Sequence, residues 1–195
     1  MKKYELTDEI KLWYGRTLHR IVALRDFGRV KKGDKGGWIE KEENLSHEGL
    51  CWVYDNAQVF DKARVYDNAQ VYGKARVFGD AWAFDNAQIF DKARVFDKAQ
   101  VYGKAQVYGN AKVYDNAQIC SDAKISDGKD YIVFKNWWSS GRYFTWTRSN
   151  NMWSVGCFYG TGEELIKKAY EDSEDKGKHY EEIVEYVNRC VLKNK

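Results

Sequence analysis

Three histidines are the first residues to consider for proton-transfer chemistry: His19, His47 and His179. A general base must lie near the bond that it serves, and none of the three falls in the repetitive middle of the chain. His19 and His47 lie in the first fifty residues, and His179 lies on the last helix that the sequence predicts. We therefore expect all three to be structural or surface residues, and the sequence predicts no catalytic residue.

A cluster of aromatic and basic residues near the C-terminus points to binding. Trp, Tyr and Arg dominate the hot spots of protein interfaces, and they also stack on the bases of single-stranded nucleic acids. The predicted binding residues are Trp137, Trp138, Arg142, Tyr143 and Arg148, with Trp82 as a separate surface feature earlier in the chain. The alternative is that such rings form the core of a small sheet, which we expect for Trp146 and Trp153 because they fall on predicted strands.

The thiols and carboxylates offer less chemistry. Four cysteines, of which Cys157 is one, include no Cys-x-x-Cys pair, so neither a disulfide framework nor a structural zinc is expected. The apolar neighbours of Cys157 favour a buried thiol over a nucleophile. Aspartates recur regularly, but lysines lie beside them and corner hydrogen bonds explain them, so no metal site is predicted. The chain has no phosphate-binding glycine loop, and the sequence indicates no cofactor.

The composition narrows the class of protein. The 195 residues carry 32 Lys and Arg against 29 Asp and Glu, a balance too even to predict a nucleic-acid binder from charge alone. No apolar run is long enough to span a bilayer and no leader precedes the polar start, so we expect a cytoplasmic protein without a membrane partner. The mean hydropathy is −0.71 although 16% of the residues are aromatic.

A hexad repeat accommodates these rings. It runs without insertion from Val53 to Lys124, beginning VYDNAQ VFDKAR VYDNAQ. Position 1 is Val or Ile, position 2 Tyr or Phe, position 3 Asp, Gly or Ser, and position 5 always Ala; Ala83 and Cys120 are exceptions at positions 1 and 2. A hexad period gives no single apolar face on an α-helix but is a multiple of the period of a strand, in which side chains alternate.

Each hexad therefore predicts a short strand followed by a corner. Asp or Gly followed by Asn or Lys is turn chemistry, and β-branched and aromatic residues favour strands. We expect positions 1 and 5 to point inward and positions 2 and 6 to point outward. The outward rings then form one aromatic ladder on each face, which either stabilises neighbouring coils or contacts a partner.

The pattern resembles the hexapeptide-repeat, left-handed parallel β-helix family. That resemblance implies three hexads in each triangular coil, hence about four coils, and side-by-side trimers. The string RIVALRDFGRVKKGDKGGWIEKEENLSHEGLCWVYDNA also resembles the leader of a bacterial and phage group of such proteins, some of which are named transferases. Acyltransferases of the family generally use a catalytic His, and loops that interrupt their coils shape the pockets; this chain has neither feature in its repeats.

We therefore predict a mainly β protein in three parts: an N-terminal β cap (1–50), a left-handed parallel β-helix (51–128) and a small C-terminal α+β module (129–195). Strands are expected at Tyr131–Lys135, Arg142–Thr147 and Met152–Phe158. One helix is expected to begin after an N-cap at Thr161, and a second spans about 178–191.

The last part of the chain resembles a C-terminal module of phage and prophage proteins, in its string GCFYGTGEEL. This resemblance implies a non-enzymatic phage-type binding protein, and we predict an inhibitor of a bacterial defence system, such as an anti-CRISPR protein. The expected partners are a host protein or a protein–nucleic-acid complex, further copies of the chain as a trimer, or a small signalling nucleotide. The alternatives are a hexapeptide-repeat acyltransferase-like enzyme and a structural phage or scaffold protein.

Overall fold

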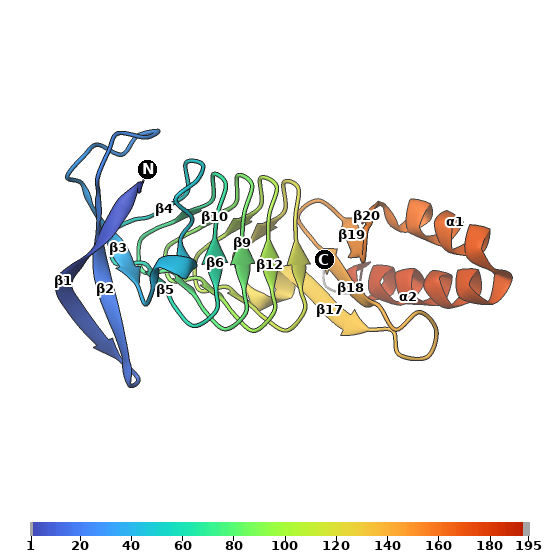
Figure 1. The fold of residues 1–195 in the computed structure, drawn as a ribbon. Coiled ribbons are helices and arrows are strands. Elements are labelled where there is room, and N and C mark those ends of the chain that lie inside the picture. The colour runs from blue at the N-terminus through green and yellow to red at the C-terminus, as the bar shows by residue number, and fades with distance from the viewer. Residues whose placement is uncertain (1, 193–195) are drawn as a thin grey trace.

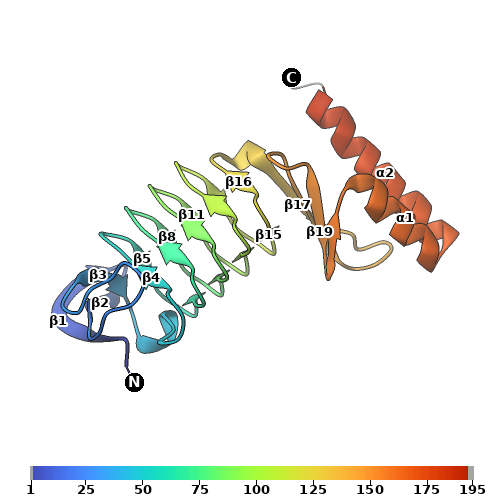
Figure 2. The ribbon, with the colours of Figure 1, turned by 90° about the horizontal axis from the view of Figure 1, so that it is seen from above.

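The protein is a β-solenoid rod with a β-hairpin at one end and a small sheet with two helices at the other (Figure 1). The structure is a computed structural model that describes residues 2–192. The coils lie side by side in a row between the two ends (Figure 2). The mainly β architecture predicted from the repeat is confirmed.

Each hexad contributes one short strand. The coil strands are β4 (Trp52–Val53), β5 (Gln58–Val59), β6 (Arg64–Val65), β7 (Gln70–Val71), β8 (Arg76–Val77), β9 (Trp82–Ala83), β10 (Gln88–Ile89), β11 (Arg94–Val95), β12 (Gln100–Val101), β13 (Gln106–Val107), β14 (Lys112–Val113), β15 (Gln118–Ile119) and β16 (Lys124–Ile125). Strands three hexads apart pair in parallel, as Gln88 does with Gln106. Every third strand therefore joins the same sheet, in the orders β5-β8-β11-β14, β4-β7-β10-β13-β16 and β6-β9-β12-β15.

The interior of the rod consists of the aliphatic and alanine positions. Each Val or Ile at position 1 and each Ala at position 5 is buried. From Phe60 to Tyr114 the aromatic rings at position 2 lie outside and stack on the ring one coil away, with centroids 4.8 to 5.3 Å apart. Tyr54 differs, because it packs against the buried core. This arrangement confirms the predicted inward and outward positions. Phe60 is an exception in exposure only, because Leu18 and Trp38 of the cap cover it.

The corners explain why aspartate recurs. Seven corner aspartates, Asp91 among them, have φ between 52° and 61°, a left-handed conformation that Asp and Asn tolerate better than most residues. Six of them also accept a hydrogen bond from the backbone N–H one coil further on, as Asp91 Oδ2 does from Gly109 at 3.0 Å. Position 3 therefore both forms the corner and ties successive coils together.

The rod has about five coils rather than the predicted four, because the cap supplies another. Strand β3 (Lys35–Ile39) pairs in parallel with β5, and Leu45 forms a bridge to Val65. Gly37 takes the place of the corner alanine in this coil, where an added Cβ would lie 2.6 Å from Val53. The sequence pattern hides this coil because the short 3₁₀ helix η1 (Glu42–Asn44) replaces one regular corner.

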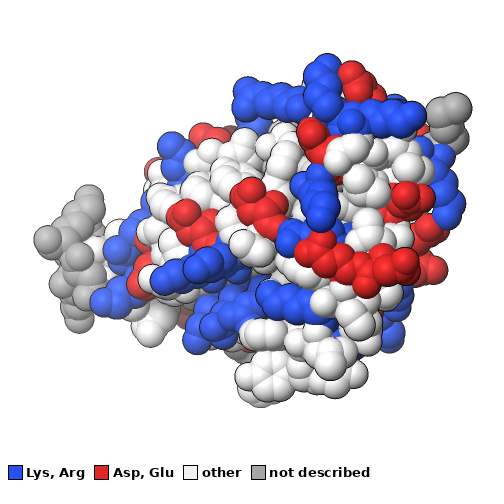
Figure 3. All heavy atoms as spheres, turned by 90° about the vertical axis from the view of Figure 1, so that its left-hand side faces the viewer, with Lys and Arg blue, Asp and Glu red and all other residues white. Residues whose placement is uncertain are grey.

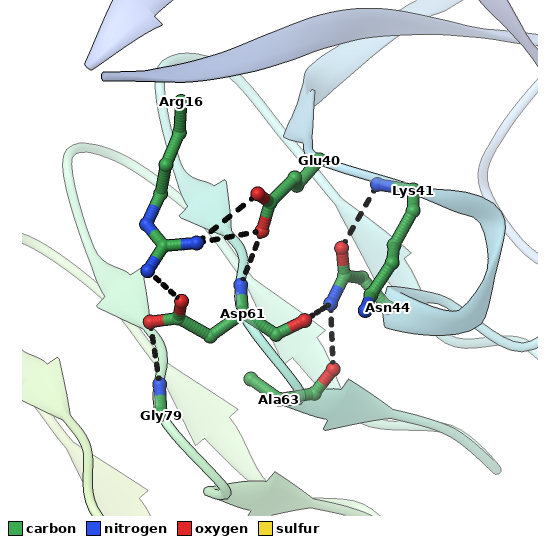
Figure 4. A network of polar contacts seen from close by, with 7 residues as sticks. All are labelled: Arg16, Glu40, Lys41, Asn44, Asp61, Ala63 and Gly79. Carbon is green, nitrogen blue, oxygen red and sulfur yellow. Dashed lines mark hydrogen bonds and ion pairs between the residues drawn. The ribbon is translucent and has the colours of Figure 1, made fainter. Parts of the chain in front are cut away.

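The cap hairpin consists of β1 (Tyr4–Trp13) and β2 (Arg16–Ala23), which extends the sheet that contains β3. Arg16 bridges Glu40 and Asp61, while Glu40 accepts a hydrogen bond from the Asp61 N–H at 2.6 Å (Figure 4). At the turn of the hairpin Leu12 and Tyr14 are exposed. Seen from the cap end, positive and negative residues mix over most of the surface, and an uncharged bulge lies at its lower edge (Figure 3).

The opposite end, which we call the head, has one antiparallel sheet and two helices. Its strands are β17 (Tyr131–Lys135), β18 (Tyr143–Thr147), β19 (Met152–Val155) and β20 (Phe158–Gly160), after the 3₁₀ helix η2 (Gly128–Asp130). Helix α1 (Gly162–Asp172) begins with the predicted cap at Thr161, whose Oγ1 accepts a hydrogen bond from Glu164 N–H. Helix α2 (Glu174–Leu192) starts earlier than predicted.

The head sheet rests on the last coil. The Gln118 backbone N–H donates to Thr145 Oγ1 at 3.0 Å, and Ser154 Oγ donates to the Gln118 side chain at 2.8 Å. Neither α1 nor α2 is long and apolar enough to cross a membrane.

We expect Asp91→Ala to destabilise the rod by about 1–3 kcal/mol, because alanine loses the hydrogen bond to Gly109 and disfavours positive φ. Asp91→Asn is the matched control: asparagine tolerates this conformation and keeps an acceptor oxygen, so it should stay within about 0.5 kcal/mol of the parent. Chemical denaturation measures both. Equal losses in the two variants would contradict the role assigned to the corner.

Candidate functional site

One candidate site is a hollow in the head, between the β19–β20 turn and the helices. We call it the head cleft; its volume is about 410 Å³. It is lined by Arg142, Val155, Gly156, Cys157, Phe158, Tyr159, Leu165, Lys168, Ala169, Asp172, Lys176 and Tyr180. Its wall combines the apolar edge of the head core with polar and charged side chains, as small-molecule sites usually do.

The charge of the head cleft is positive. Lys176 forms an ion pair with Asp172, and the Lys176 ammonium lowers the pKa of that carboxyl. Lys168 Nζ lies 3.9 Å from Glu171 Oε2, an exposed and therefore weak pairing. Arg142 forms no salt bridge among the described residues, although its charge also helps to lower the pKa of the Asp172 carboxyl. Its guanidinium can therefore contact an anionic ligand.

Tyr180 provides an unsatisfied hydrogen-bonding group in the wall of the head cleft. Its residue is 3% exposed, and its hydroxyl has no hydrogen-bond partner among residues 2–192. The ring packs edge-on against Phe144, with centroids 4.8 Å apart. Buried hydroxyl groups are normally satisfied, so this one points to a ligand or water that completes the site.

A second hollow continues the head cleft onto the coils. This junction groove is lined by Lys98, Gln100, Asn116, Gln118, Arg142, Tyr143 and Gly156. Arg142 and Gly156 line both hollows, so the two adjoin at these residues. Gln118, Gln100 and Trp82 are register partners on β15, β12 and β9, and they form one outward column that leads away from the groove.

The structure brings two of the six predicted binding residues, Arg142 and Tyr143, to the junction groove. Trp82 lies two coils from Gln118 on the same outward column, half-exposed beside Tyr66, and lines a separate hollow with Arg64. Trp137 and Trp138 lie in the loop after β17, 78% and 44% exposed and edge-on to each other.

The other residues predicted in the head include one that is exposed and two that are buried. Arg148 is exposed at the opposite end of β18 from Arg142. Trp146 and Trp153 are buried, which confirms that they belong to the core. That Trp137, Trp138 and Arg148 bind a partner stays a prediction.

The histidines have different local roles. His47 Nδ1 accepts a hydrogen bond from the Lys3 backbone N–H at 3.2 Å, and its ring stacks on Tyr4. The neutral ring therefore carries its proton on Nε2, which has no lone pair to act as a base. His19 Nδ1 lies 3.2 Å from the Thr7 carbonyl, and His179 Nδ1 lies 2.8 Å from the Asp175 carbonyl.

The carboxylate oxygens of Glu40 and Asp61, beside the cap, all have hydrogen-bond or ion-pair partners. Glu40 and Asp61 line another cleft, at the first coils and separate from the head cleft, together with Arg16, Lys62 and Lys98. Both Glu40 oxygens accept hydrogen bonds, and Asp61 uses one oxygen for Arg16 and the other for the Gly79 N–H (Figure 4). The network fastens the cap to the rod. Within residues 2–192 no three His, Cys, Asp or Glu side chains group together as metal ligands.

The thiols differ strongly in their surroundings. Cys51 and Cys120 are buried, and burial raises the pKa of both. Cys157 was predicted to be buried, but it is exposed. The reason is that the expected strand Met152–Phe158 is broken by a tight turn at Gly156 and Cys157, with Val155 paired to Phe158 and Gly156 at φ 60°.

Comparison with known proteins agrees with the coil geometry. Residues 57–73, 69–83 and 105–121 match the YdcK Beta solenoid repeat family. The chain is also 39% identical over 72 residues to a protein of Escherichia coli (strain K12) named "Uncharacterized acetyltransferase YdcK". That alignment covers 32% of this chain and 22% of the relative's length.

These similarities correct the prediction of a non-enzymatic protein, because the relative is named as an acetyltransferase. The prediction excluded acyl transfer because the coils contain no histidine and no interrupting loop. The head cleft and the junction groove show that a site can instead form where the coils end. Inhibition of a bacterial defence system has no support in these similarities, and the phage-type resemblance of the head stays a prediction.

We expect His47 to make cap stability depend on pH. Burial lowers the pKa of His47, so the unfolded chain binds more protons than the folded chain between that value and about 6.5. Stability contributed by neutral His47 should therefore fall as the pH drops through this window. The loss of melting temperature between about pH 7.5 and about pH 5.5 should be smaller in His47→Gln, which keeps an acceptor for Lys3. An unchanged pH profile in that variant would contradict this role.

Proposed function

We propose that the chain is an acyl-group transferase of the β-solenoid type, with its donor bound where the head meets the coils. One observation carries the proposal: Arg142 lines both the head cleft and the junction groove, so one extended molecule can occupy both. The name of the E. coli relative supports the reaction class. A phosphate-bearing thioester, such as acetyl-CoA, fits the combination of an apolar hollow and a polar groove.

Each hollow would hold one part of the donor molecule. The acyl group would lie in the head cleft, against Val155, Leu165 and Ala169. The anionic part would lie in the junction groove, where Lys98 and Arg142 supply positive charge and Gln100 and Gln118 supply amide donors. Trp82, one coil beyond Gln100, offers an exposed ring on which a flat group could stack.

The reaction needs the thioester carbonyl to be held beside cationic groups. Attack on the carbonyl carbon places negative charge on its oxygen, and the bond to the donor sulfur then breaks. Arg142 and Lys168 line the cleft and would stabilise that charge, which is usually a large contribution to such catalysis. The rigid coils add preorganisation, because their backbone hydrogen bonds fix the groove before the donor arrives.

Assembly into side-by-side trimers remains a separate proposal. It is supported by the half-exposed aromatic ladders that run along the outside of the coils, such as the one that ends at the 41% exposed Tyr114.

We expect Arg142→Gln to weaken acetyl-CoA binding by about 10- to 100-fold, because a hydrogen bond to a charged group contributes about 1.5–3 kcal/mol. Isothermal titration calorimetry measures this effect. Lys92→Gln is the matched control, since it removes one exposed charge at a coil corner outside both hollows. Binding that is equal in the parent and Arg142→Gln, or absent in the parent at millimolar donor, would contradict the proposal.

A further inference from the structure

Cys157 lies at the mouth of the head cleft in a setting that the other described thiols lack. It occupies the tight turn between β19 and β20 and is exposed, whereas Cys51 and Cys120 are buried. The Val155–Phe158 pair closes the turn, and Arg142 lies beside it, with its Cδ 3.6 Å from the position of an added Gly156 Cβ. A thiol is the most nucleophilic of the side chains that line this cleft.

The head cleft that Cys157 lines contains independent signs of a ligand. The buried Tyr180 hydroxyl in its wall has no partner among the described residues. Arg142 and Lys168 bring positive charge to the same wall, where a carbonyl oxygen would gain negative charge during attack. The volume of about 410 Å³ leaves room for an acyl group beside the sulfur.

We propose that Cys157 accepts the acyl group from the thioester donor and carries it as a covalent intermediate. The inference rests on the proposed acyl-transfer function. Cys157 Sγ, after losing its proton to water, attacks the carbonyl carbon of the donor. The bond between that carbon and the donor sulfur breaks, and the departing thiolate takes up a proton.

The products are an acyl-Cys157 thioester and the free thiol of the donor, so one thioester replaces another without oxidation or reduction. Such exchange between similar thioesters is nearly balanced in free energy, and water is the only proton carrier that it needs. The acyl group then lies on an exposed turn, where an acceptor molecule can reach it from solvent.

The test is acetylation of the intact chain by acetyl-CoA, followed by intact mass measurement and peptide mapping. We expect a hydroxylamine-sensitive acetyl group on Cys157, formed at least tenfold faster than on the same protein in denaturant. Cys157→Ser should lose the label, and Cys51→Ser should keep it. A label formed at equal rates in folded and denatured protein, or one confined to lysines, would overturn the inference.

Further measurements on variants distinguish failure of this inference from failure of the proposed function. Lys98→Gln, which changes the junction groove but not the head cleft, should slow acetylation by acetyl-CoA at least tenfold, but should change labelling by a small thioester without phosphates far less. Cys157→Ser should still bind acetyl-CoA with parent affinity. Donor binding and acetyl transfer to an amine that persist in Cys157→Ser would overturn the covalent role and leave the transferase proposal intact. Failure of acetyl-CoA to bind the parent, together with no labelling of Cys157 by the small thioester, would overturn both.

Discussion

The parallel stacking of coils, each three hexads long, is the constraint on which the rest of the structure depends. Main-chain hydrogen bonds join each strand to the next, as the Gln88 N–H donates to the Ala105 carbonyl and the Phe90 N–H to the Val107 carbonyl. This stacking is possible only while the interior holds aliphatic residues and the corner position holds alanine or glycine. Outward side chains therefore fall into straight columns, and the column of Trp82, Gln100 and Gln118 becomes part of a candidate site.

The repeat predicted the fold because each of its positions has one physical role. Val59 and Ala63 are buried and Tyr66 stacks on Phe84 outside, as the alternation of side chains along a strand required. The extra coil formed by the cap was missed because Gly37 and Leu45 do not follow the hexad letters. Their equivalence to coil positions emerges only from the pairing of β3 with β5.

The candidate site was predictable only in part. Arg142 and Tyr143 were identified from their residue types, and the column that contains Trp82 follows from the length of the coil. The head cleft did not follow from the sequence, because it depends on how α1 and α2 lie against the sheet. Close contact at Gly177, where an added Cβ would collide with the Tyr170 ring, brings α2 against α1, and Tyr180 packs on Phe144 of the sheet.

The candidate site lies where the coils meet the head. Regular coils supply a rigid amide-lined face, but the coil thiol Cys120 is buried. The head supplies cations, the exposed Cys157 thiol and an apolar wall. We therefore propose the junction as the site of function, in keeping with the rule that a fold positions a site without determining its chemistry.

A crystal structure of the chain with a non-hydrolysable analogue of acetyl-CoA tests this account most directly. The account predicts electron density that begins in the head cleft beside Cys157, passes Arg142 and continues along Gln118 and Gln100. Density elsewhere on the rod, with the head cleft and the junction groove left to solvent, would contradict it.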